Sequence, residues 1–134
     1  MTRIHFHTYV RRDLEEISLL DSIGATRIIA FLEQAQSDPH LLEKLTTRYQ
    51  RGRKDNLDIK KWQTLHRAGH AIWRLRFIDF TYRVPDYRLI YLPTVADRVI
   101  TIMAICKRSE IDYDDPHHHI YRRIVHACNE LKKI

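Results

Sequence analysis

The sequence predicts an α+β domain in which a small mixed or antiparallel sheet of about four strands is flanked by N-terminal helices and a C-terminal helix. Residues 71–113 read as three consecutive strands, AIWRLRFIDF, YRLIYLP and RVITIMAICKR. The segments before and after them carry apolar residues at helical spacing. With 134 residues, 44% of them hydrophobic, the chain has the size of one domain spanning residues 1–134.

The N-terminal third predicts one strand and two helices. Residues 3–10 alternate apolar and polar side chains, as a short first strand does. Apolar residues then keep helical spacing over residues 12–36, and Gly24 is expected to kink or break this helix. Asp38 and Pro39 supply an N-cap and a first-turn proline, so a second helix is expected to begin there.

The middle of the chain predicts a loop, a short helix and the strands. Residues 48–56 are polar and basic and predict the loop. The short helix that follows is expected to bury Ile59, Trp62 and Leu65. The segment 99–106 is apolar on both faces, which places this strand centrally in the sheet with cover on each side.

The C-terminal segment predicts an amphipathic helix. Asp115 and Pro116 repeat the start signal of the earlier helix. An apolar stripe follows at Ile120, Ile124, Cys128 and Leu131.

The two cysteines, Cys106 and Cys128, are expected to be small core residues rather than a disulfide, which indicates a reducing cytoplasm. The longest uncharged apolar run is too short to span a bilayer, so no membrane partner is expected.

The strands carry arginines in a regular pattern. Arg74 and Arg76 alternate with Trp73 and Leu75, so a pleated strand puts both arginines on one face. Arg88 then interrupts an otherwise apolar strand. Guanidinium is a rigid fork that stays charged, and it suits a phosphate or carboxylate ligand. The alternative is that these arginines only solvate an edge strand.

The third strand ends in Lys107 and Arg108, shortly before Tyr113. The net charge of +6 favours an anionic partner. Two plainer interpretations remain: ion pairs between this basic end and the acidic residues after it, and Tyr113 as an aromatic packed under the last helix.

The succession WRLRF, DYRLIY and a hydrophobic strand ending in KR, with a tyrosine five residues further, resembles the RelE/ParE superfamily of toxins from type II toxin–antitoxin pairs. The resemblance covers roughly residues 71–134, and the N-terminal half agrees in pattern only. It implies a small basic α+β toxin of the cytoplasm that needs no cofactor and is held inactive by a cognate antitoxin protein. Its target would be mRNA on the ribosome in the RelE branch, or DNA gyrase in the ParE branch.

The resemblance implies catalytic positions for five residues: Arg74, Arg76, Arg88, Arg108 and Tyr113. Metal-independent cleavage of RNA by its own 2′-hydroxyl needs a base, an acid for the leaving 5′-oxygen, and positive charge around the phosphorus. The family often has lysines where Arg74 and Arg76 stand, and arginine cannot serve as a base. The general base therefore stays open between Tyr113, His70 and the histidines 117–119.

Further RNA contacts are expected from basic, aromatic and imidazole side chains around these positions: Lys107, Tyr82, Arg83, His117 and His118. Residues 77–86 are longer than a tight hairpin, which leaves the register of Arg76 against Arg88 open. No metal site is expected, because His66 and His70 lack the glutamate of a metalloprotease helix.

Three functions compete at this point. The first is a RelE-like, ribosome-dependent mRNA endoribonuclease that arrests translation. The second is a ParE-like protein that poisons gyrase without catalysis. The third is a non-catalytic binding module on the same fold.

Overall fold

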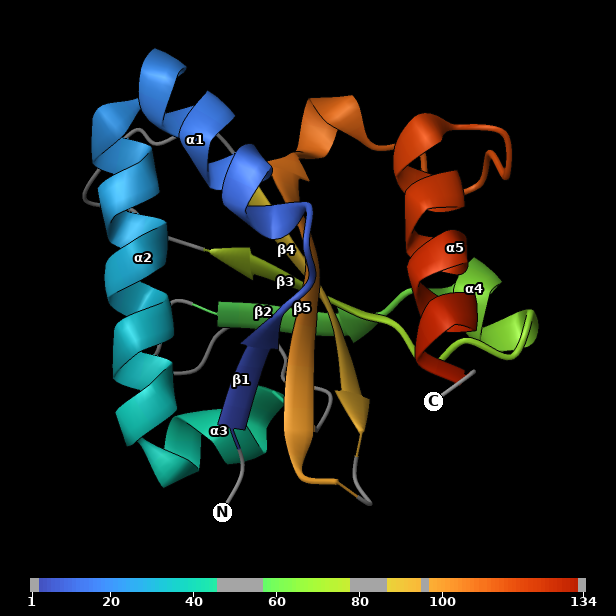
Figure 1. The fold of residues 1–134 in the computed structure, drawn as a ribbon, viewed down its shortest axis with the longest axis horizontal. Coiled ribbons are helices and arrows are strands. Elements are labelled where there is room, and N and C mark those ends of the chain that lie inside the picture. Colours follow the sequence, from blue (N-terminus) through green and yellow to red (C-terminus); the bar gives the residue numbers. More distant parts are fainter. Residues whose placement is uncertain (1–2, 46–56, 78–86, 95–96, 133–134) are drawn as a thin grey trace.

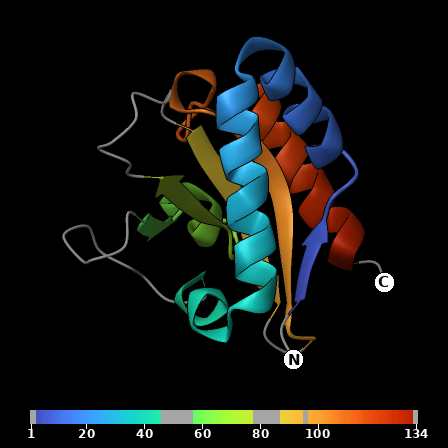
Figure 2. The ribbon, with the colours of Figure 1, turned by 90° about the vertical axis from the view of Figure 1, so that its left-hand side faces the viewer.

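The computed structural model describes residues 3–45, 57–77, 87–94 and 97–132, and it has one five-stranded mixed sheet between two layers of helices (Figures 1 and 2). The strands are β1 (Arg3–Phe6), β2 (Leu57–Lys61), β3 (Trp73–Phe77), β4 (Tyr87–Thr94) and β5 (Val99–Lys107). The helices are α1 (Val10–Leu20), α2 (Ser22–Ser37), α3 (Pro39–Leu45), α4 (Gln63–Arg67) and α5 (His119–Lys132), with a 3₁₀ turn at Arg108–Glu110. The predicted fold class is confirmed.

The strand order is β1-β5-β4-β3-β2. β1 runs parallel to β5, and the other three pairings are antiparallel. β5 lies between β1 and β4, and seven of its nine residues are buried, so its predicted central place is confirmed.

Each face of the sheet has its own core. Helices α1, α2 and α3 cover one face, where Ile28 and Leu42 pack with Leu75 and Leu89 of the sheet. Helices α4 and α5 lie on the other face, where Ile124 of α5 belongs to the same core as Ile90 and Trp62. Among the described residues, no helix is long and apolar enough to cross a membrane.

The long N-terminal helix is broken at Asp21, and not at Gly24 as the sequence predicts. Asp21 caps α2, because its Oδ1 accepts a hydrogen bond of 2.9 Å from the Gly24 amide, and its Oδ2 accepts one of 2.9 Å from the Tyr87 hydroxyl. A Cβ on Gly24 would collide with the Asp21 carboxylate and come within 2.9 Å of the Tyr87 ring. Gly24 therefore allows α2 to approach β4 closely instead of breaking the helix.

β2 stands where the sequence predicts a short helix, so that prediction is wrong for residues 57–61, and the sheet has five strands rather than about four. Ile59 is buried opposite Leu75 of β3. The apolar spacing of Ile59, Trp62 and Leu65 fits a helix, but a strand followed by the single turn α4 buries the same three residues. Pairing with β3 decides between them, because it supplies long-range backbone hydrogen bonds that local spacing does not reveal.

The ends of β1 and α3 can also be compared with the prediction. β1 ends at Phe6, four residues earlier than predicted, since Val10 already begins α1. α3 begins at Pro39 as predicted, with Asp38 accepting bonds from the next free amides. The predicted loop at 48–56 lies outside the described residues.

α5 begins at His119 and not at Pro116. Asp115 folds a local turn instead, because its Oδ1 accepts from the His117 amide at 2.9 Å and its carbonyl accepts from the His118 amide at 3.1 Å. The apolar stripe of the helix is confirmed, with Ile120, Ile124 and Cys128 buried. Cys106 and Cys128 are both buried free thiols, as predicted.

Candidate functional site

Four cationic side chains from three neighbouring strands line one pocket, which we call the basic pocket: Lys60, Arg74, Arg76 and Arg88. Its volume is about 70 Å³. That is room for roughly two water molecules at about 30 Å³ each, or for one small oxyanion. The lining side chains all carry positive charge, so the pocket suits an anionic group.

Strand register brings these residues together. Arg76 lies directly opposite Arg88 in the β3–β4 ladder, and Lys60 lies opposite Arg74 in the β2–β3 ladder. Directly opposite residues of an antiparallel pair share a face and stand about 5 Å apart. The alternation predicted for β3 is confirmed, since Trp73 and Leu75 belong to the core on the opposite face.

Burial makes this arrangement rigid. Arg88 is 8% exposed, and Arg74 and Arg76 are half-buried. Four cationic side chains gathered on one face attract an anion, so the geometry favours an anionic ligand.

Tyr113 lies between two of the predicted arginines. The guanidinium carbon of Arg74 is 4.4 Å from the centre of its ring, and that of Arg108 is 4.8 Å from it. Tyr113 itself is anchored in the core, where Trp62 packs edge-on at 4.7 Å and donates a 3.0 Å hydrogen bond to the Tyr113 carbonyl. The ring thus orients both guanidinium groups by cation–π contact.

The Tyr113 hydroxyl is buried, and it lies near the Arg74 guanidinium without hydrogen-bond geometry to any described residue. Burial raises the pKa of Tyr113, and the nearby Arg74 charge only partly opposes this effect. At neutral pH the side chain is therefore a neutral phenol, which is poorly suited to act as a general base.

Arg108 leads from the end of β5 into the 3₁₀ turn and is exposed. Its Nη1 donates a 2.9 Å hydrogen bond to the Ile111 carbonyl, which folds the side chain back over Tyr113. Arg74 takes part both in this aromatic contact and in the basic pocket. The five residues predicted as catalytic are thus connected in space through Arg74.

Cys106 lies opposite Arg88 in the β4–β5 ladder. Burial, helped by Asp13 and Glu110, raises the pKa of this thiol to about 12. A nucleophilic cysteine needs the thiolate form, so Cys106 has no such role here.

The residues predicted to bind RNA are not gathered at the basic pocket. Tyr82 and Arg83 lie outside the described residues. Lys107 lies opposite Tyr87, on the other face of the sheet from Arg88. His117 is exposed, and His118 stacks on His119 with ring centres 4.5 Å apart.

None of the three histidines, nor His70, is among the residues that line the basic pocket. No group of three metal-ligating side chains occurs in the described part of the chain.

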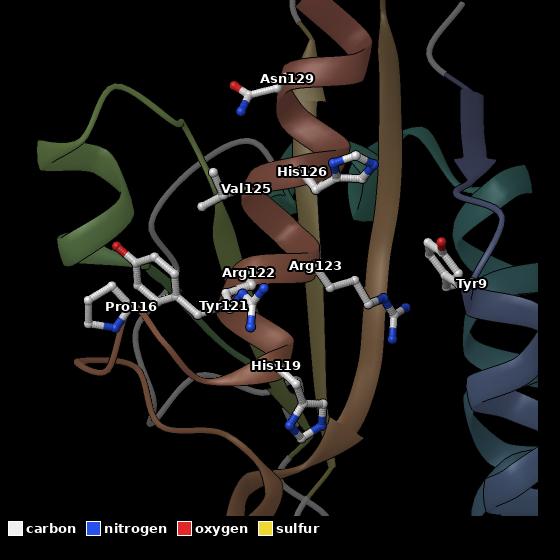
Figure 3. Close-up of a pocket in the computed structure, with 9 residues that line it drawn as sticks. All are labelled: Tyr9, Pro116, His119, Tyr121, Arg122, Arg123, Val125, His126 and Asn129. Atoms are coloured by element: carbon white, nitrogen blue, oxygen red, sulfur yellow. The ribbon is translucent and has the colours of Figure 1, made fainter.

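A second concave surface, of about 840 Å³, lies between α5 and the start of α1. Figure 3 shows its lining residues, with Arg123 extending from α5 towards Tyr9. A neighbouring hollow of about 490 Å³ includes Lys107 and His119. Both hollows lie away from the basic pocket and share none of its lining residues.

Lys60 is the residue of the basic pocket that the sequence prediction misses. The signal was present in LDIKK, where Leu57, Ile59 and Lys61 alternate with Asp58 and Lys60. A segment of five residues is too short for this period to exclude a helix.

Comparison with known proteins finds one structural likeness. No family model matches this chain, and no curated protein matches it in sequence. A solved structure of the E. coli toxin RelE, a double arginine-to-alanine mutant in the free state, is similar to it with a TM-score of 0.43. The two sequences are 16% identical over 94% of this chain and 96% of that chain. The similarity extends over nearly the full length of both chains and concerns the fold alone.

Proposed function

We propose that this protein is a RelE-like toxin that cleaves mRNA on the ribosome and is held inactive by a cognate antitoxin. The observation that carries the proposal is the basic pocket together with Tyr113, which connects it to Arg108. The sequence resemblance of residues 71–134 supplies the class of reaction and the ribosome as its location. The net charge of +6 agrees with an RNA substrate.

In this proposal the basic pocket holds the scissile phosphate. Arg76 and Arg88, paired across two strands, donate to the phosphate oxygens and stabilise the charge that grows on them in the transition state. Their positions are fixed by the sheet before substrate arrives, so little reorganisation is needed during the reaction.

Arg74 lines the same pocket, and the Tyr113 ring holds it and Arg108 by cation–π contact. Because the hydroxyl of Tyr113 is buried, the role proposed for this residue is to position the two arginines. An acidic segment of the antitoxin laid over the same cations would compete with RNA.

The test is inducible expression with and without a co-expressed candidate antitoxin, combined with translation measurements and mapping of mRNA 5′ ends. Translation arrest with new 5′ ends inside codons is expected, and the partner should suppress both. Continued translation with accumulating double-strand DNA breaks would instead support the gyrase-directed alternative.

The burial of Tyr113 favours a second candidate, a binding module without catalysis. None of the candidate bases (Tyr113, His70 and the histidines 117–119) lines the basic pocket, and burial raises the pKa of Tyr113. In that case the protein would bind RNA or another polyanion with a strong salt dependence, yet mRNA incubated with it and ribosomes would stay intact.

A further inference from the structure

We propose that Lys60, on the edge strand β2, donates the proton to the leaving 5′-oxygen when RNA is cleaved. The inference rests on the proposed function and adds a residue that the sequence resemblance does not include. Lys60 lines the basic pocket with Arg74, Arg76 and Arg88, and it lies directly opposite Arg74 in the ladder.

Lys60 is chemically different from the other three residues of the pocket. Arginine stays protonated in proteins, so three guanidinium groups can hold a phosphate but cannot exchange a proton with it. The ammonium of lysine has three rotatable N–H donors and can give one of them up. Of the four side chains that line the pocket, Lys60 is therefore the one able to act as a proton donor.

Nearby alternatives are less suited to the task. The Tyr113 hydroxyl is buried, and burial raises its pKa. The Cys106 thiol is buried, with its pKa raised to about 12. Lys60, by contrast, is exposed at the edge of the sheet, where both substrate and solvent can reach it.

The step balances without a redox partner. The 2′-oxygen attacks phosphorus and forms the new P–O bond, while its proton passes to water. The bond between phosphorus and the 5′-oxygen breaks, and its electron pair stays on that oxygen. Lys60 gives this oxygen a proton, so the products are a 2′,3′-cyclic phosphate and a 5′-hydroxyl, and water then returns a proton to the amine.

Lys61 offers a matched control on the same strand. It is the next residue, so it points to the opposite face, where its Nζ lies 5.6 Å from the centre of the Trp73 ring. A change at Lys61 removes the same charge from the same strand but leaves the basic pocket intact.

The experiment compares the wild type with Lys60→Arg, Lys60→Ala and Lys61→Ala in single-turnover cleavage of ribosome-bound mRNA. Two substrates are used, one natural and one with sulfur replacing the 5′-oxygen at the scissile bond. Circular dichroism and thermal unfolding of each variant confirm that folding is retained.

On the natural substrate, both Lys60 variants should lose roughly a hundredfold to ten-thousandfold in rate, the scale of general acid catalysis. Lys61→Ala should stay close to wild type. On the sulfur substrate the Lys60 variants should approach the wild-type rate, because a thiolate leaves without being protonated.

Different failures have different meanings. If Lys60→Arg keeps the wild-type rate, Lys60 supplies charge alone and the proton-donor role is refuted. An equal loss on both substrates refutes it as well. If the wild type cleaves neither mRNA, the proposed function itself fails, and this inference fails with it.

Discussion

Asp13 of α1 and Arg123 of α5 form a bidentate ion pair, with N–O distances of 2.9 and 2.6 Å. Both side chains also bind β5, because Asp13 accepts from the Ile105 amide at 3.0 Å and Arg123 donates to the Met103 carbonyl at 2.9 Å. β1 pairs with β5 only along Val99–Ile102. The ion pair therefore covers the stretch of β5 that β1 leaves open, and it joins the two ends of the chain.

Removing one partner of this pair should destabilise the protein strongly. Asp13→Ala or Arg123→Ala leaves a mostly buried charge and a backbone group without partners, so the free energy of unfolding should fall by about 3–5 kcal/mol. The double variant Asp13→Ala/Arg123→Ala should lose much less than the sum of the two single losses. Urea unfolding of the four proteins gives the coupling energy, and strictly additive losses would contradict the arrangement.

Replacing Arg108 should lower the cleavage rate without changing stability, whereas replacing Arg88 should change both. Arg108→Ala should lower the rate by roughly two to three orders of magnitude, the scale seen when one charge-stabilising donor is removed. Arg108 is exposed, so stability should hardly change. Arg88 is 8% exposed, so Arg88→Ala also removes packing contacts. Thermal unfolding of this variant is therefore measured as well, to separate a loss of stability from a loss of activity. Arg11→Ala, an exposed arginine of α1, is the charge-matched control.

Tyr113 should act through its ring. Tyr113→Phe keeps the ring contacts to Arg74 and Arg108 and removes a buried hydroxyl that lies near Arg74 without hydrogen-bond geometry, so both rate and stability should stay near wild type. Tyr113→Leu loses the aromatic face, and the cleavage rate should then fall. A large loss in Tyr113→Phe, measured by single-turnover cleavage, would assign the hydroxyl a chemical role instead.

Stability should fall as the solution becomes mildly acidic. Burial lowers the pKa of His7 and of His66 below the ordinary 6.5, although Glu130 opposes this at His7 and the Ile72 carbonyl opposes it at His66. The unfolded chain then binds protons more readily than the folded one. The free energy of unfolding therefore has its full value above about pH 6.5 and decreases below it. Urea midpoints between about pH 7.5 and 5.5 measure this slope. Substituting both histidines by Gln should make the slope shallower, and an unchanged slope would rule out this origin.

The sequence predicts those features that depend on period and on strong local signals. The alternation of Arg74 and Arg76 against Trp73 and Leu75 places both arginines on one face, and Asp38 with Pro39 begins α3. Features decided by partners distant in sequence escape prediction. β2 forms because β3 accepts it, and Asp21 ends α1 because it caps α2 and binds Tyr87 at the same time.

The candidate site follows the same rule. The sequence identifies the arginines, but the pairing of Arg76 with Arg88 depends on a register that no local pattern fixes. Lys60 joins them only through the unpredicted strand. The anchoring of the Tyr113 ring likewise depends on Trp62, which is 51 residues away in the chain.

Met103 is an extra residue in β5, since Ile90 pairs with Ala104 and Tyr91 with Ile102. Met103 and Ala104 accordingly both face the α5 side, and the alternation of side chains between the two faces of the sheet shifts by one residue at this point. Because the strand is apolar on both faces, the change leaves no trace in its hydropathy. If the same residues paired without this bulge, Ile105 would stand opposite Arg88 and Lys107 would lie on the arginine face. A deletion of Met103 would instead remove the bulge and leave Cys106 opposite Arg88. The bulge thus determines which side chains the end of β5 presents beside the basic pocket.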